Sequence, residues 1–127
     1  MCIPPIEEDP ISHFTKLKIL ANENNIDSLY PFTNESYDAA ALLVLSMQAA
    51  YSTDGSIFKD NILEIANSPG TKIYPGEIKK GLELLSKGKK INYEGATGVT
   101  LLNNGDAKGS FLEVRVKGNK FKTIKQR

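Results

Sequence analysis

A single cysteine, Cys2, and a single histidine, His13, leave this sequence with few groups for nucleophilic or metal chemistry. One cysteine cannot form a disulfide within the chain. An enzyme that pairs Cys2 with His13 is the alternative, but no third group is placed to orient the histidine, and a position on a helix surface explains His13 better. The acidic cluster 7–9 lacks the alternating spacing of a calcium loop. We therefore predict no catalytic centre, no metal site and no cofactor.

Long apolar runs and a strong net charge are also missing. The most apolar run, 39–45, is far shorter than the ~18 residues that a membrane-spanning helix needs. Sixteen basic residues against fifteen acidic ones leave a formal charge of +1, so no overall field favours nucleic acid as a partner. We expect a soluble chain without an export signal. The basic segment 117–127 is interpreted as a solvated, edge-protecting strand in preference to an anion-binding patch.

Helical periodicity dominates the first two thirds of the chain. Apolar residues at helical spacing predict a helix over 10–22. The clearest helix covers 37–50, is rich in alanine and leucine, and has Asn34 or Ser36 as its expected cap. This helix is apolar nearly all round, so we expect it to be buried on more than one side.

Two further helices and several strands complete the pattern. Apolar residues continue at helical spacing over 57–65 and 78–86. Beyond them the period changes, and a strand is predicted over 99–102 before an Asn-Asn-Gly-Asp turn. Alternating residues over 111–116 and 121–124, separated by a Lys-Gly-Asn turn, predict a hairpin. The expected fold is α/β, with about three to four helices followed by C-terminal strands and a hairpin.

Two loop regions are candidates for binding. The glycine-rich segment 95–98 leads into a strand, so no helix dipole directs its amides at a phosphate, and a tight turn is the preferred interpretation. Tyr30, Phe32 and Tyr37 lie around one junction between a loop and a helix, where binding residues often occur. From these residues alone, core packing and ligand contact are both open explanations of the aromatic group.

Several segments, in consistent order and spacing over 28–124, resemble one family, the leucine-type (branched-chain amino acid) periplasmic substrate-binding proteins of ABC transporters. The most distinctive is the Tyr-Asp-Ala start of an alanine- and leucine-rich helix. Single motifs of this length are common, whereas the series in order is specific. The matching segments are 36–40, 52–55, 92–98, 103–109 and 111–124.

The resemblance implies a partial type I periplasmic-binding-protein fold, with 1–127 as a single incomplete domain from the C-terminal segment of two lobes. Members of the family capture an amino acid or a related small molecule non-covalently between the lobes and work with an ABC permease. The resemblance therefore implies transport without catalysis, at a periplasmic or extracellular location. A sensory or regulatory ligand-binding module of the same fold is the alternative.

One ligand contact of the family carries over to this chain. Phe32 matches the aromatic residue that packs on the ligand side chain, where burial of apolar surface contributes about 25 cal/mol per Å². Tyr37 is close to it in sequence and is the second candidate for ligand binding. Asp38 is interpreted as a first-turn acid that interacts favourably with the helix dipole. In the family, the ligand's amine and carboxylate are held mainly by residues earlier in the chain.

The apolar helix 37–50 also predicts self-association. A helix of this kind needs cover on several sides, and the units that supply it in the family precede this region. We therefore expect the isolated chain to form oligomers, to exchange segments, or to be a piece of a longer product. A monomer in size-exclusion chromatography, together with a cooperative unfolding transition, would contradict this expectation.

Overall fold

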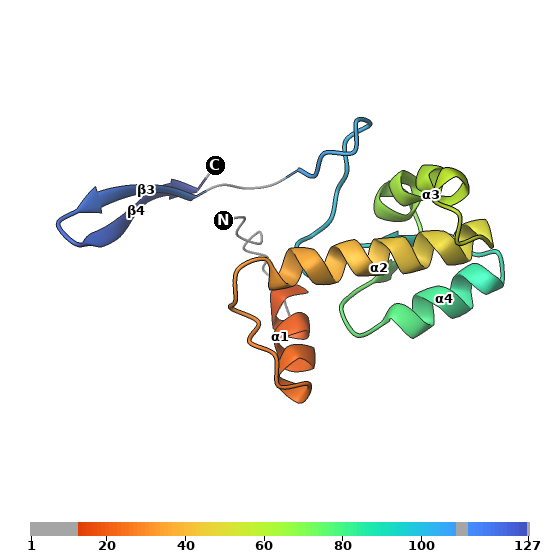
Figure 1. Ribbon diagram of the computed structural model, residues 1–127, viewed down its shortest axis with the longest axis horizontal. Coiled ribbons are helices and arrows are strands. Elements are labelled where there is room, and N and C mark those ends of the chain that lie inside the picture. The colour runs from red at the N-terminus through yellow and green to blue at the C-terminus, as the bar shows by residue number, and fades with distance from the viewer. Residues whose placement is uncertain (1–12, 109–111, 127) are drawn as a thin grey trace.

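The computed structural model describes residues 13–108 and 112–126, and Figure 1 shows their arrangement. Four helices and four strands make up this part of the chain. A helical part is followed by a C-terminal hairpin. In chain order the elements are α1 (His13–Glu23), α2 (Thr33–Ala50), α3 (Gly55–Asn67), β1 (Thr71–Ile73), α4 (Ile78–Ser86), β2 (Ile91–Tyr93), β3 (Leu112–Lys117) and β4 (Lys120–Gln126).

The strands form two separate two-stranded sheets. β1 and β2 pair in parallel, with Thr71 opposite Ile91 and Ile73 opposite Tyr93, and α4 makes the crossover between them. β3 and β4 pair antiparallel as the predicted hairpin. The combination of a β-α-β unit with further helices confirms the predicted α/β class.

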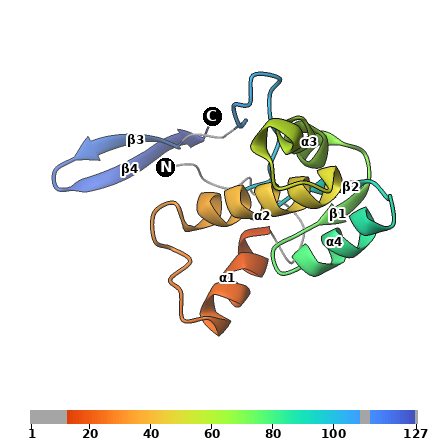
Figure 2. The ribbon, with the colours of Figure 1, turned by 45° about the vertical axis from the view of Figure 1, so that its right-hand side comes forward.

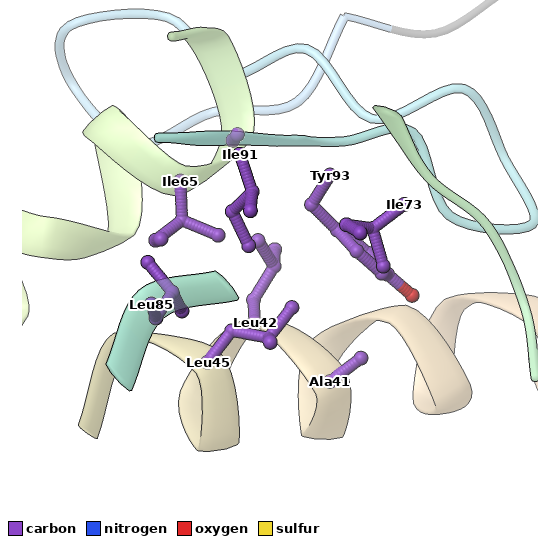
Figure 3. Close-up of a cluster of buried hydrophobic side chains, with 9 residues drawn as sticks. Ala41, Leu42, Leu45, Ile65, Ile73, Leu85, Ile91 and Tyr93 are labelled. Atoms are coloured by element: carbon purple, nitrogen blue, oxygen red, sulfur yellow. The ribbon is translucent and has the colours of Figure 1, made fainter. Parts of the chain in front are cut away.

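The core lies between the parallel sheet and α2. Figure 3 shows Ile91 and Tyr93 from β2 and Ile73 from β1 pointing toward α2, which carries Leu45. All four side chains are at most 1% exposed. α4 approaches α2 closely through Gly81, where an added Cβ would lie 2.8 Å from the Leu45 side chain. The core therefore depends on a small residue on α4 opposite a large one on α2.

α2 is buried on more than one side, as the sequence predicts, and one of its faces is open. Figures 1 and 2 show it between α3 and α4, and Figure 3 shows the sheet across its inner face. Its outer face is open, and Leu43 and Val44 are each 43% exposed. No charged residue occurs between Asp38 and Asp54 to solvate this face. The prediction of burial on more than one side is confirmed. Self-association of the isolated chain stays a prediction.

The predicted caps of α2 are wrong. Thr33 already lies in the helix, so Asn34 and Ser36 belong to its first turns and cannot precede it. Phe32 is the N-cap residue, and its carbonyl accepts a hydrogen bond from the Ser36 amide at 2.9 Å. Thus the backbone, without a capping side chain, sets the start of this helix.

The break before α3 supplies a capping side chain. Asp54 precedes the helix, and its carboxylate accepts hydrogen bonds from the Ser56 hydroxyl at 2.7 Å and the Ser56 amide at 2.8 Å. Both bonds lower the pKa of Asp54 because they favour the charged carboxylate, and the bond from the hydroxyl has the larger effect.

The prediction of a strand over 99–102 is also wrong. Leu101 alone pairs across the turn, with Ala107, in an isolated bridge. The Asn67 side chain replaces a partner strand. Its amide nitrogen donates to the Leu101 carbonyl at 2.8 Å, and its oxygen accepts from the Leu101 amide at 3.0 Å. The strands β1 and β2 were not predicted, because three-residue strands between helices show no clear alternation.

His13 is buried, which corrects the expectation of a surface histidine. It is 6% exposed, and its ring centroid lies 4.9 Å from that of Tyr74. Lys16 of α1 sits over the same tyrosine ring at 3.7 Å, a cation–π contact. The residues His13 and Lys16 thus attach α1 to the loop after β1. Cys2, the cluster 7–9 and the predicted start of this helix lie outside the described residues.

The described residues contain neither a membrane-spanning helix nor a cluster of metal-binding side chains. None of the helices there is long and apolar enough to cross a membrane. In the same ranges, no group of three or more histidine, cysteine, aspartate or glutamate side chains is placed to hold a metal ion.

The position of the core predicts that two leucines of α2 contribute very differently to the free energy of unfolding. Leu45→Ala should lower the free energy of unfolding by about 2–5 kcal/mol, because it leaves a cavity against Ile73 and Gly81. Leu43→Ala, half-exposed on the same helix, should cost about 1 kcal/mol or less. Urea unfolding followed by circular dichroism measures both, and equal losses would contradict this placement of the core.

Candidate functional site

A pocket lies between α1 and the start of α2. Its volume is about 640 Å³, and aliphatic and aromatic side chains form most of its wall. Both residues predicted to bind ligand, Phe32 and Tyr37, line it. The described lining residues include no aspartate, glutamate, lysine, arginine or histidine. They are Leu17, Leu20, Ala21, Asn24, Ile26, Tyr30, Pro31, Phe32, Thr33, Ser36 and Tyr37.

Phe32 occupies a strained backbone position at the mouth of this pocket. Its φ is 67°, in the left-handed region, which costs a residue with a Cβ about 1–2 kcal/mol. The side chain is 72% exposed, so burial of the ring does not compensate for the strain. An exposed aromatic ring on a strained backbone is a feature that occurs at binding sites, and here it stands beside an apolar pocket.

The loop before Phe32 holds its shape by local hydrogen bonds. Asp27 caps the turn, since its carboxylate accepts from the Leu29 amide at 2.9 Å. The Asp27 carbonyl accepts from the Thr33 hydroxyl at 3.3 Å, which closes the loop on the first residue of α2. Leu29 and Tyr30 are nevertheless 70% and 71% exposed. The loop therefore presents large apolar side chains to the outside.

Tyr37 has both a binding and a structural position. Its ring lines the pocket, and its hydroxyl oxygen accepts a hydrogen bond from the Gly76 amide at 2.9 Å. That bond joins α2 to the turn before α4. The hydroxyl hydrogen remains able to donate, since the bond with Gly76 uses the oxygen only as an acceptor. Tyr37 thus combines an apolar wall with one polar group at the pocket edge.

Asp38 is a buried junction between α2 and the glycine-rich turn, which corrects its interpretation as a first-turn acid. It is 4% exposed and accepts four hydrogen bonds. The Tyr93 hydroxyl donates at 2.8 Å, the Ala96 amide at 2.8 Å, and the Thr97 amide and hydroxyl at 3.0 and 2.7 Å. The segment 95–98 forms the predicted tight turn, and its amides bind this internal carboxylate.

The turn can approach Asp38 because of Gly95. Its φ is 62°, and a Cβ there would lie 2.7 Å from the Asp38 carboxyl carbon and 2.8 Å from the Tyr93 ring. Burial raises the pKa of Tyr93, and the negative charge of Asp38 raises it further. Tyr93 therefore stays protonated as the donor to Asp38.

The sequence predicted one wall of the site and missed the other. Phe32 and Tyr37 are brought together, as their spacing around the helix start suggests. The opposite wall comes from α1, which the sequence predicted as a helix without a role in binding. Its lining residues are Leu17, Leu20 and Ala21. The signal available for Asp38 was its position as the last charge before a charge-free stretch of helix.

The chain is similar to part of a substrate-binding protein. Over 72 residues it is 35% identical to BasB, the substrate-binding protein of a chemotactic signal transduction system from Halobacterium salinarum. The matched stretch is 55% of this chain and 17% of that protein, so the chain spans less than a fifth of the relative's length. The chain matches no protein-family model, and no solved structure matches it.

The tyrosine at the junction gives a pH-dependent prediction. Tyr93→Phe should lower the free energy of unfolding at pH 7 by about 1.5–3 kcal/mol, because charged Asp38 loses a hydrogen bond. Above pH ~10, Tyr93 ionises in the unfolded chain while its raised pKa keeps it protonated in the folded one. The wild type therefore loses stability above this pH, whereas the variant does not. The difference in the free energy of unfolding between the two proteins becomes smaller.

Urea unfolding at pH 7, 9, 10 and 11 checks this behaviour. Tyr30→Phe is the matched control, because Tyr30 is 71% exposed and its difference from the wild type should not change with pH. A Tyr93→Phe difference that stays constant up to pH 11 would show that the buried hydroxyl does not act as described.

Proposed function

We propose that this chain is part of a substrate-binding protein of the leucine type, which captures an amino acid or a related small molecule without chemical change. The apolar pocket beside Phe32 is the observation that carries the proposal. The similarity to a substrate-binding protein over 72 residues supports it, as does the order of family-like segments along the chain.

The composition of the pocket fits one end of such a ligand. Phe32, Ile26 and Leu20 offer apolar surface, while the described lining carries no charged side chain. An aliphatic or aromatic ligand side chain suits this wall, whereas an ammonium or carboxylate group left there would be unpaired. Other parts of the binding protein would hold those charged groups, as the resemblance implies.

Two systems use a captured small molecule in this way. As a component of an ABC importer, the protein would deliver its ligand to a permease after the lobes close. As a sensory module, it would present the liganded lobes to a signalling partner, and the role of BasB in a chemotactic signal transduction system favours this second candidate. Permease and ATPase genes beside the coding sequence would support transport, and a receptor or kinase gene would support sensing.

We also propose a periplasmic or extracellular location and a protein without catalytic activity. In a substrate-binding protein the ligand leaves unchanged, so no nucleophile is required. His13, the one histidine, is packed on the Tyr74 ring and does not line the pocket. An enzyme based on Cys2 and His13 would lose its activity when both are replaced by alanine.

The site can be tested by titration with small amino acids. L-leucine at millimolar concentration should shift the backbone amide NMR signals around Phe32 and Tyr37, and glycine should not, because it lacks an apolar side chain. Phe32→Ala should weaken L-leucine binding about 10-fold or more, because it removes the exposed aromatic face that the bound ligand would cover.

Leu29→Ala is the matched control. Leu29 lies in the same loop and is 70% exposed, but it does not line the pocket. Its replacement should leave the L-leucine titration unchanged. Shifts confined to residues away from the pocket, or equal losses in both variants, would rule out this site.

A further inference from the structure

The start of α2 forms one wall of the pocket, and a buried carboxylate follows it directly in the chain. The lining residues around this helix start are Phe32, Thr33, Ser36 and Tyr37. Asp38 comes next but does not line the pocket, and it is 4% exposed. Its carboxylate is hydrogen-bonded to residues of the interior. A side chain beside the proposed ligand contact therefore attaches the wall to the rest of the fold.

The apolar core holds α2 mainly beyond this wall. The buried apolar residues of the helix begin at Ala41. Before that position Phe32 and Ser36 are exposed, and Tyr37 packs at the edge of the core while half-buried. The bonds of Asp38, and the bond between the Tyr37 hydroxyl and an amide in the turn before α4, tie this part of the helix to other elements. Polar contacts thus supply much of its attachment.

Four donors surround the Asp38 carboxylate, two at each oxygen. One oxygen accepts from the Tyr93 hydroxyl and the Ala96 amide, and the other accepts from the amide and the hydroxyl of Thr97. Only a carboxylate can accept at all four places, because an amide side chain turns an N–H group toward one pair of donors. The junction is therefore specific for aspartate, and asparagine would lose half of its bonds.

These contacts lie inside the described part of the chain. Tyr93 and Ala96 are completely buried, and the residues that bond to Asp38 are 55 to 59 positions away from it. One side chain therefore joins the pocket wall to the end of the parallel sheet. Additional parts of a longer protein would pack outside this junction and leave its bonds in place.

We propose that Asp38 is a positioning residue for the ligand pocket. Its carboxylate holds the start of α2 against the end of β2, so that Phe32 and Tyr37 stand in place before the ligand arrives. A wall that has to be ordered during binding lowers the affinity by the fraction of molecules in which it is already ordered. This role rests on the proposed function, since it concerns the same pocket.

The replacement Asp38→Asn separates positioning from ligand contact, because it removes hydrogen bonds and leaves every lining side chain unchanged. L-leucine should bind this variant about 10-fold more weakly than it binds the wild type, as measured by the amide NMR shifts around Phe32 and Tyr37. The matched control is Asp54→Asn, the same replacement at the exposed cap of α3. It should leave the titration unchanged.

Amide hydrogen exchange without ligand tests the wall independently of binding. The Gly76 amide donates to the Tyr37 hydroxyl, and it should exchange about 10-fold faster in Asp38→Asn because the helix start opens more often. The Ser68 amide, bonded at the end of α3, should change much less. Leu45→Ala is the control for a merely structural effect. It destabilises α2 from the core and should raise both exchange rates in the same proportion.

A milder variant covers the case in which Asp38→Asn does not fold. Thr97→Val keeps the carboxylate and the amide donor, and it removes the hydroxyl that donates at 2.7 Å. Because one bond is lost, L-leucine affinity should fall and Gly76 exchange should rise by about threefold each. Thr97 does not line the pocket, so a direct contact with ligand cannot explain these changes.

Two results would overturn the positioning role. They are equal increases in exchange at Gly76 and Ser68 in the folded variants of the junction, or an L-leucine titration that these variants leave unchanged. A wild type that shows no shifts with L-leucine would refute the proposed function instead. The exchange comparison would then still decide whether Asp38 fixes the start of α2.

Discussion

One buried carboxylate, that of Asp38, joins α2 to the end of β2 and to the turn that follows it. Asp38 projects from α2 and accepts hydrogen bonds from Tyr93 at the end of β2 and from the turn that follows. A charge removed from water is costly unless its oxygens are fully hydrogen-bonded, and the amides of Ala96 and Thr97 satisfy that condition. Without this junction, the start of α2, which carries Phe32 and Tyr37, would not be fixed against the sheet.

The sequence predicted the helices because burial repeats at helical spacing along each of them, and it predicted the hairpin because alternating residues flank a Lys-Gly-Asn turn. It failed where one contact from far along the chain decides the structure. Asn67 takes the place of a strand beside Leu101, and no local pattern contains that information. The cap of α2 failed for a related reason, since the backbone of Phe32 starts the helix while the usual capping residues Asn34 and Ser36 lie inside it.

The candidate site was half predictable. Phe32 and Tyr37 follow one another around a helix start, and that closeness is visible in the sequence. The wall from α1 depends on how that helix docks, through His13 and Lys16 on the Tyr74 ring. Those contacts join residues about sixty positions apart, and a helical pattern alone does not say which neighbour its apolar face will meet.

The left-handed backbone at Phe32 lowers the stability of the fold, while the ring at the same position is the proposed ligand contact. Glycine adopts this conformation without a steric penalty, so it would relax the start of α2 while removing the ring from the pocket mouth. Selection for folding alone would favour glycine or asparagine there. If Phe32 binds ligand as proposed, a related protein whose pocket takes no ligand should therefore carry glycine or asparagine at position 32.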